Sequence, residues 1–344
     1  FGNDASDSAV DYRDYAVCVL PYTEMPDGYL DEAAIRHAKL TMSDERFRME
    51  YLCEFISDTK GFFKRSVIEA CTPSTITSDG KIITHPEAFT VELFSDGVST
   101  YVMGIDPARS KLGDNFAISI CKIMHGKTRL VYMETFKGKS YVHIAKTIYK
   151  LVNDFNIQAI GIDKGGAGQA LVDILVDETS AGENPRLLDK NDPDFEDAAG
   201  RRIIELINYQ SDWLKNANFD LQADFDHHKF LFPYRIDEEL YEYNSKTYDG
   251  SDLKRLNEAW FDITEAKNEI SAIVATPIGR AENIHFDLPE AQNNPYDVRR
   301  KDRYSATLIA ADQARKIIKT GVIEDIGLAD SEPIEGFWLE DNSN

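Results

Sequence analysis

The sequence lacks the features that place a protein in a membrane or on a disulfide scaffold. No apolar run approaches the roughly 18–20 residues that a membrane-spanning helix needs, and residues 1–4 have neither the basic nor the apolar part of a signal peptide. The first residue is not Met, as expected of a fragment or a processed chain. The four cysteines form no Cys-x-x-Cys pair. This disfavours structural zinc and disulfides and predicts reduced thiols in a cytoplasmic protein.

Histidine-rich motifs and positive charge are also scarce. No His-x-x-x-His or His-Glu-x-x-His spacing occurs among the seven histidines, so a histidine-built metal site has little support. The 38 Lys and Arg residues face 60 Asp and Glu residues, which gives a formal net charge of −22. Such a chain repels nucleic acid and anionic membranes at long range. Composition alone therefore argues against a DNA-binding protein.

What is present is enough apolar material for a packed core. The chain is 42% hydrophobic and 11% aromatic over 344 residues, which excludes global disorder and allows one large domain or two smaller ones. Residues 1–95 are expected to be mostly helical, with a capped amphipathic helix from Ser43 to Phe55. Turn-rich sequence between 72 and 96 predicts a boundary there.

Residues 96–325 alternate between strand and helix patterns, which predicts a mixed α/β sheet flanked by helices. Residues 177–200 are acidic and turn-rich and are interpreted as an exposed insertion, and residues 326–344 form an acidic C-terminal tail. Strands are expected at 100–105, 116–124, 129–136, 157–162, 203–207 and 283–286, and helices at 141–155, 168–176, 253–274 and 304–318.

Two of these apolar strands end in the same tripeptide, Gly-Ile-Asp. The first ends at Asp106 and the second at Asp163. If the strands are neighbours in the sheet, their carboxylates converge on one point, where they repel unless a proton or a cation lies between them. Carboxylate oxygens select a hard cation such as Mg²⁺ or Mn²⁺.

A third carboxylate, Asp302, stands at the expected start of the last helix, among basic residues. Three acids suffice for a two-metal site, in which ions about 3.5–4 Å apart stabilise the attacking and leaving oxygens of phosphodiester hydrolysis. Asp114, at the start of the second strand, is a candidate auxiliary ligand. The candidate phosphate contacts around Asp302 are Arg299, Arg300, Lys301 and Arg303.

Each of these acids also has a purely structural interpretation. Asp106 precedes a proline and suits a turn, Asp163 precedes a glycine-rich turn, and Asp302 suits a helix N-cap. The glycines at 165, 166 and 168 could open a phosphate-binding helix or merely a tight turn. The repetition of the Gly-Ile-Asp ending favours the functional interpretation.

A second phosphate-binding candidate fails on its spacing. Residues 138–140, Gly-Lys-Ser, follow a strand and precede a helix, as in a nucleotide-binding loop. Position 133 would have to be glycine and is Met. A Walker A site is therefore not expected.

At these residues the chain resembles the nuclease domain of tailed-phage terminase large subunits. The motifs that carry the resemblance are Gly104 to Ala108 leading to Asp114, then Gly161 to Asp163 with its glycine turn, then Arg300 to Ala306 opening a helix. Residues 46–55 resemble the segment that follows the motor domain. The acidic stretch 177–200 is not part of the family pattern.

The resemblance implies an RNase H-like fold over residues 96–325 and a metal-dependent endonuclease that cuts double-stranded DNA concatemers during genome packaging. It implies that Asp106, Asp163 and Asp302 bind two Mg²⁺ or Mn²⁺ ions, assisted by Asp114. It also implies a phage or prophage protein in a bacterial host, with portal and small terminase subunit as partners. Residues 1–95 would then be the end of the motor domain and its linker.

Three other functions stay open at this point. The same fold and metals serve resolvases and strand-transfer enzymes, against which residues 47–55 weigh. A docking module for portal or small terminase would use the acidic surface without turnover. A sugar-kinase-like ATPase shares the strand order and would bind ATP. If the protein is a nuclease, its charge predicts weak, salt-sensitive and metal-dependent DNA binding by the chain alone.

Overall fold

The computed structural model describes most of the chain and divides it into two compact units, residues 1–60 and 61–344. The described residues are 20–26, 29–41, 51–53, 61–76, 82–107, 116–196, 198–234, 248–277, 284–289 and 300–321. In the first unit they form the short 3-10 helix η2 (Tyr22–Glu24) and helix α1 (Glu32–Thr41). The helix expected from Ser43 to Phe55 lies outside the described residues, except for 51–53.

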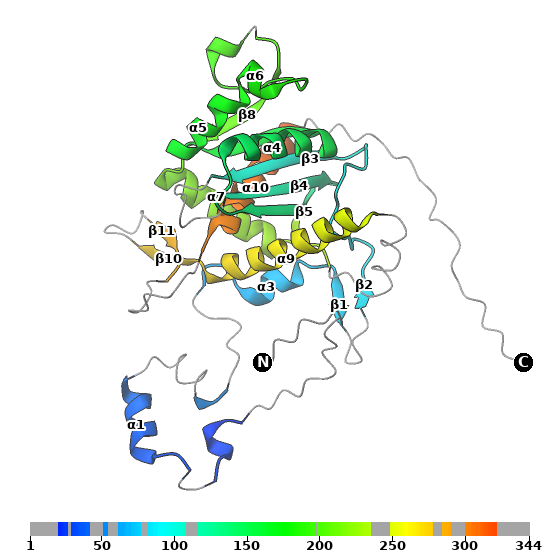
Figure 1. The fold of residues 1–344 in the computed structure, drawn as a ribbon. Helices are drawn as coiled ribbons and strands as arrows, with labels where there is room; N and C mark the ends of the chain where they lie inside the picture. The colour runs from blue at the N-terminus through cyan, green and yellow to red at the C-terminus, as the bar shows by residue number, and fades with distance from the viewer. Residues whose placement is uncertain are drawn as a thin grey trace, which may run out of the picture. The chain divides into compact units, whose positions relative to one another are not determined.

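The second unit is built around a seven-stranded mixed sheet (Figure 1). Its strand order is β7-β8-β6-β3-β4-β5-β9. The strands are β3 (Thr100–Asp106), β4 (Phe116–Met124), β5 (Lys127–Phe136), β6 (Ile157–Asp163), β7 (Leu187–Asp189), β8 (Arg201–Ile207) and β9 (Phe230–Leu231). Strand β4 is antiparallel to both β3 and β5, whereas β6 is parallel to β3 and β8. This is the predicted mixed α/β fold, with the strand order of an RNase H-like domain.

Local sequence explains the first hairpin and the helix that follows it. His125 and Gly126 join β4 to β5 with φ values of 51° and 68°, as a two-residue hairpin turn requires. Helix α4 (Tyr141–Phe155) begins where the Ser140 side chain accepts the His143 N–H, and its C-cap, Asn156, is left-handed. The Ser140 of the failed nucleotide-loop candidate is thus a helix cap.

Further helices complete the second unit. Helix α10 packs across β3, β4 and β6, and α9 packs on β5 beside α10 (Figure 1). The helices are α3 (Arg65–Ala70), α5 (Gly166–Leu175), α6 (Glu178–Ala181), α7 (Ser211–Asp226), α9 (Gly250–Ala272) and α10 (Asp302–Thr320), with the 3-10 helix η3 (Pro193–Phe195). Two small hairpins pair β1 (Ser74–Ile76) with β2 (Ile82–Thr84) and β10 (Val274–Pro277) with β11 (Ile284–Asp287).

The two faces of β3 meet different helices. Tyr101 packs against Phe155 of α4 with the two rings tilted, their centroids 5.6 Å apart. Gly104 instead faces α10, so closely that an added Cβ would lie 2.2 Å from the Ala306 carbonyl oxygen. Because side chains alternate along a strand, Gly104 and Asp106 share the face that α10 covers.

The structure corrects the interpretation of residues 177–200 as an exposed insertion. This stretch contains β7, which pairs with β8 at one edge of the sheet, and its Leu187 and Leu188 are fully buried. Several of its acids are local caps: Asp177 accepts the Ser180 N–H at the start of α6, and Asp192 accepts the Asp194 N–H at the start of η3. Acids at cap positions gave the stretch its loop-like composition.

The contacts place residues 61–95 with the sheet, whereas the sequence predicts a boundary at 95/96. Phe63, Ile68 and Leu93 are buried in the core of the second unit. That residues 1–95 correspond to the end of a motor domain and its linker stays a prediction. The acidic tail 326–344 lies outside the described residues. Among the residues described, no helix is long and apolar enough to cross a membrane.

An ion cluster ties α10 to β8 and predicts how stability depends on pH. Burial works against ionisation of Glu205, but hydrogen bonds from Lys190, Lys316 and Gln313 prevail and lower its pKa to about 2. The ordinary value is 4.5. Ionised Glu205 therefore stabilises the fold at neutral pH, and this contribution is lost as the pH falls from 4.5 toward 2.

We expect Glu205→Gln to lower the free energy of unfolding at pH 7 by about 1–3 kcal/mol, the usual value of hydrogen bonds to a charged group. Its unfolding free energy should also fall less steeply than that of the wild type between pH 4.5 and 2. Urea unfolding at a series of pH values measures both effects, with the exposed Glu183→Gln as control. Equal pH slopes for wild type and Glu205→Gln would contradict this assignment.

Candidate functional site

The two Gly-Ile-Asp strands are neighbours, in register and parallel. Gly104 pairs with Gly161 and Ile105 with Ile162, so the next residue on each strand is an aspartate, Asp106 or Asp163. Adjacent strands lie about 4.8 Å apart. The two carboxylates therefore leave the same edge of the sheet side by side, on the face that α10 covers.

Helix α10 begins at this same edge with Asp302. Its direction follows from its contacts with β8: the hydroxyl of Tyr209, beyond the end of β8, lies beside Ser305, whereas Glu205 within β8 binds Gln313 and Lys316. The N-terminus of α10 thus lies where β6 and β8 end. Asp302 is four residues, about one turn, before Ala306, which covers Gly104.

The structure does not assemble all the predicted ligands into one group. In the part of the chain that it describes, no three His, Cys, Asp or Glu side chains are grouped so as to hold a metal ion. Asp114 and Arg299 lie outside the described residues. The sheet brings together the two acids of β3 and β6, and the third ligand and the auxiliary acid stay predictions.

Asp163 also performs the structural role that its sequence context allows. One of its carboxylate oxygens accepts the Gly165 N–H at 3.1 Å, which fixes the turn into α5. A Cβ on Gly168 would lie 1.8 Å from the Asp163 carbonyl oxygen, so this glycine is needed for close packing of strand and helix. The tight-turn interpretation therefore explains Gly168.

Tyr209 lies beside the two acids and was not expected from the sequence. Its hydroxyl is buried and lies beside the Ser305 side chain. Burial raises the pKa of Tyr209, and the charges of Asp106 and Asp163 raise it further, as does the nearby Tyr304. The sequence signal that could have indicated Tyr209 is its position two residues after β8, which ends at the same edge of the sheet as β6.

The basic residues around Asp302 face different surroundings. Arg300 lies 4.0 Å from the Asp302 carboxylate, and Lys301 pairs with Asp287 at 2.9 Å with its side chain 38% exposed. Arg303, by contrast, turns inward: its side chain is 12% exposed and binds Asp262 at 2.7 Å and Glu269 at 2.9 Å. Arg303 is therefore an internal ion-pair residue rather than the phosphate contact that the sequence suggested.

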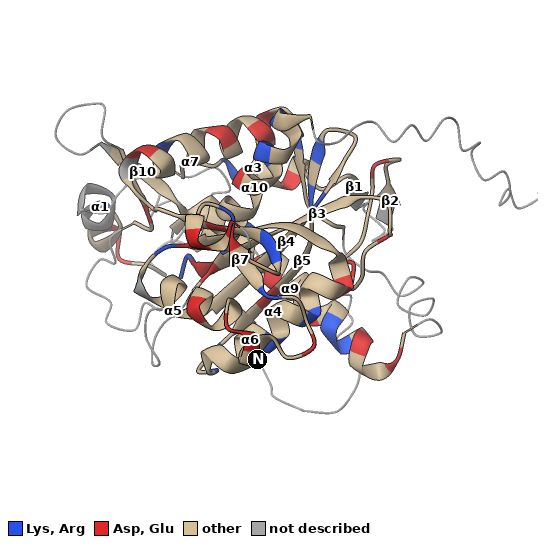
Figure 2. Cartoon of the chain, turned by 90° about the horizontal axis from the view of Figure 1, so that it is seen from above, with Lys and Arg blue, Asp and Glu red and all other residues tan. Residues whose placement is uncertain are grey.

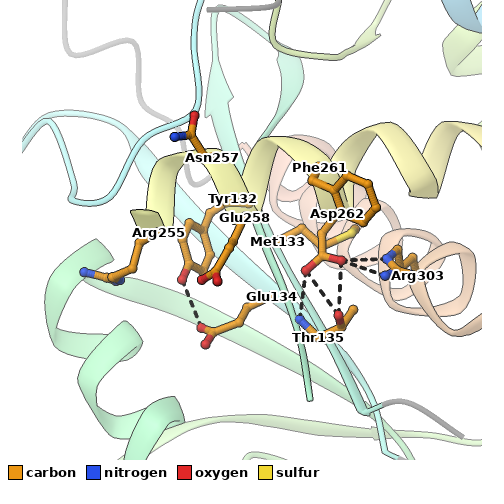
Figure 3. Close-up of a pocket in the computed structure, with 11 residues that line it drawn as sticks. Tyr132, Met133, Glu134, Thr135, Arg255, Asn257, Glu258, Phe261, Asp262 and Arg303 are labelled. Carbon is orange, nitrogen blue, oxygen red and sulfur yellow. Dashed lines mark hydrogen bonds and ion pairs between the residues drawn. The ribbon is translucent and has the colours of Figure 1, made fainter. Parts of the chain in front are cut away.

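A cavity of about 490 Å³ is lined by residues of β5 and α9 and by Arg303 (Figure 3). Asp262 reaches from α9 to Thr135 of β5 and to Arg303. Deeper in the cavity Tyr132 donates to Glu134 at 2.9 Å. The register of the sheet places Thr135 opposite Ala117, which is opposite Asp106. The ion pairs of Arg303 thus lie along the same edge as the two acids.

The strand order and the flanking helices define the fold class, an RNase H-like domain. Comparison with known families finds one that is similar over part of this domain. Residues 103–191 match the family model of the terminase RNase H-like domain, which includes both Gly-Ile-Asp strands. Residues 103–191 are therefore similar to a terminase RNase H-like domain, in agreement with the resemblance of the motifs. The match runs to residue 191 and so includes part of the acidic stretch thought to lie outside the family pattern.

Individual relatives agree with this family. The chain is 25% identical over 144 residues to the "Terminase, ATPase subunit" of Escherichia phage P2; the matched region is 41% of this chain and 23% of that protein. The chain thus spans less than a quarter of that relative's length.

Two solved structures are similar at low identity. One is the large terminase nuclease of thermophilic phage G20c with bound magnesium (13% identity, 65% of this chain, 86% of that chain, TM-score 0.41). The other is the large terminase nuclease domain of Thermus phage P74-26 (10% identity, 66% of this chain, 90% of that chain, TM-score 0.39).

Proposed function

We propose that this chain is a divalent-metal-dependent endonuclease that hydrolyses phosphodiester bonds of double-stranded DNA. The observation that carries the proposal is the in-register pair Asp106 and Asp163, on one face at the ends of neighbouring strands, within a domain that matches the terminase family. Two adjacent carboxylates at a sheet edge favour a bound cation between them.

The donor atoms suit Mg²⁺ or Mn²⁺, because carboxylate oxygens are hard ligands. Asp106 and Asp163 would hold the ions, with Asp302 completing the second site and Asp114 assisting. Two bound ions supply charge stabilisation for the scissile phosphate and lower the pKa of the attacking water.

DNA would approach the edge of the sheet where α10 begins. Arg300 and Lys301, with Arg299, are the proposed backbone contacts, because cations near a phosphate position the duplex without reading its sequence. Acidic residues are spread over many elements, with basic ones among them (Figure 2). We therefore expect weak binding that depends on salt and metal.

The biological setting follows from the same proposal. The domain, residues 96–325, would cut DNA concatemers during phage genome packaging in the cytoplasm of a bacterial host. Portal and small terminase subunit are the proposed partners, and a separate motor would deliver the DNA to this weak binder. The role of residues 1–95 as the end of that motor is part of the proposal.

Supercoiled plasmid tests the nuclease directly. We expect the purified chain to nick and linearise plasmid in Mn²⁺ or Mg²⁺, EDTA to stop the reaction, and excess metal to restore it. Asp106→Asn, purified identically, is the control for contaminating nucleases and should leave the plasmid supercoiled. Intact plasmid with the wild type in both metals would refute the proposal and favour a docking module. Equal cutting by the variant would refute the assigned site.

A further inference from the structure

The first turn of α10 is capped by a side chain from another helix. The N–H groups at the start of a helix have no partner within it, and the N-cap residue here, Lys301, provides no capping side chain. Glu269 of α9 takes this role: its Oε2 accepts the backbone N–H of Arg303 at 2.8 Å and of Tyr304 at 3.0 Å. The carboxylate also lies at the positive end of the helix dipole.

The same carboxylate holds the side chain of Arg303. Its Oε1 accepts from Arg303 Nη1 at 2.9 Å, and Asp262 accepts from Nε at 2.9 Å and from Nη2 at 2.7 Å. Asp262 in turn accepts the backbone N–H of Thr135 at 3.1 Å (Figure 3). Helices α9 and α10 and strand β5 are thus joined by ion pairs whose side chains are 9–12% exposed.

The two capped residues directly follow Asp302. Fixing the backbone of Arg303 and Tyr304 fixes the point at which the Asp302 side chain leaves the helix. Burial raises the pKa of Glu269 to about 7, against the hydrogen bonds of Tyr304 and Arg303, and the nearby charge of Asp302 raises it as well. The two backbone hydrogen bonds thus place the Glu269 carboxylate at the two residues that follow Asp302 in the chain.

We propose that Glu269 is a positioning residue for the metal site: by capping α10 it holds Asp302 where it can bind a divalent cation. The inference rests on the proposed nuclease function. Groups that orient metal ligands through hydrogen bonds commonly change metal affinity by about 10–100-fold when they are replaced. Glu269 does so through the backbone of the ligand's own helix.

Asp262 provides the matched control. Both acids pair with the Arg303 side chain, and both are nearly buried, but the backbone N–H groups of Arg303 and Tyr304 donate to Glu269 and not to Asp262. A purely structural role would give Glu269→Gln and Asp262→Asn the same consequences, because each removes one charge from the same ion-pair group. A positioning role separates them, since only Glu269→Gln puts an amide at the start of α10. Its single oxygen cannot serve both the backbone N–H groups and Arg303 Nη1, so its NH2 group faces a donor on one side or the other.

Calorimetric titration of the full chain with Mn²⁺, combined with plasmid cleavage, tests the proposal. We expect Glu269→Gln to weaken Mn²⁺ binding by about tenfold or more and to lower kcat, with little change in the apparent KM for plasmid. Glu269→Gln and Asp262→Asn should lower the melting temperature by similar amounts. Asp262→Asn, however, should bind Mn²⁺ with an affinity within about twofold of the wild type. Asp302→Asn shows what full loss of the ligand does.

The outcomes separate this inference from the proposed function. Wild type that binds no Mn²⁺ and cuts no plasmid refutes the nuclease itself. The positioning role is tested once wild type is active and Asp302→Asn loses Mn²⁺ affinity. It is overturned if Glu269→Gln then binds Mn²⁺ as tightly as the wild type. It is also overturned if Asp262→Asn weakens Mn²⁺ binding as much as Glu269→Gln does. Should Glu269→Gln not fold by circular dichroism, Glu269→Asp replaces it. Glu269→Asp keeps the charge, but its shorter side chain moves the carboxylate away from the backbone N–H groups of α10. Unchanged Mn²⁺ affinity in this variant would therefore also contradict the positioning role.

Discussion

Asp163→Asn is expected to slow plasmid cleavage by about 10²–10³-fold, because losing a few kcal/mol of metal-dependent stabilisation has that effect on a rate. Asparagine has nearly the same shape as aspartate and keeps a side-chain oxygen that can accept the Gly165 N–H, so the turn into α5 is preserved. What it removes is the negative charge beside Asp106. The variant should therefore fold normally and fail in catalysis.

The measurement is the rate of conversion of supercoiled to nicked and linear plasmid at saturating Mn²⁺, with a thermal melt of each protein. Asp173→Asn is the matched control, because Asp173 lies on the exposed face of α5, ten residues further along the chain. It should cut like the wild type. An Asp163→Asn protein that melts as the wild type does and cuts within a few-fold of it would rule out Asp163 as a metal ligand.

The sheet could be read from the sequence because its strands are buried on both faces. Such strands are continuous apolar runs, and β3, β4 and β6 were all expected within one or two residues of their observed bounds. The pairing of β3 with β6 gave the site its geometry. The sequence did not predict that β3 and β6 are neighbours in parallel register, because sequence periodicity does not specify which strands pair.

Long-range polar contacts could not be read in the same way. Glu269 and Asp262 belong to the helix that was expected at 253–274, and their partner Arg303 is 34 and 41 residues further along the chain. No local pattern distinguishes a buried ion pair from solvated charges. For the same reason Arg303 was grouped with the neighbouring basic residues as a phosphate contact.

The repeated Gly-Ile-Asp motif combines candidate metal ligands with close helix packing, and the sequence suggested only the first of these. Its aspartates attracted attention as metal ligands. Its glycines are needed for the packing of α10: Gly104 and Gly161 pair across β3 and β6, and both lie against that helix. Removing the side chains at these two positions lets α10 approach the sheet, and this places Asp302 at the edge where the aspartates end.

Gly104→Ala should therefore destabilise the protein more than either of two comparable glycine substitutions. The added Cβ would lie 2.2 Å from the Ala306 carbonyl oxygen and 2.4 Å from the Ala310 nitrogen. Both are backbone atoms, so no side chain can rotate away and the whole helix must shift. Overpacking of this kind costs about 3 kcal/mol, or a fall of roughly 6–12 °C in melting temperature for a domain of this size.

Two other glycines make a graded comparison. At Gly161 the nearest atom is Ile309 Cγ2 at 2.5 Å, in a side chain that can adjust, so Gly161→Ala should cost less. Gly250, at the start of α9, has nothing within 4 Å of an added Cβ, and Gly250→Ala should be neutral or slightly stabilising. Thermal melts of the three variants measure the order. Because α10 carries Asp302, Gly104→Ala should also lose plasmid cleavage at temperatures where it is still folded, and a Gly104→Ala protein as stable as Gly161→Ala would show that α10 does not pack on this glycine.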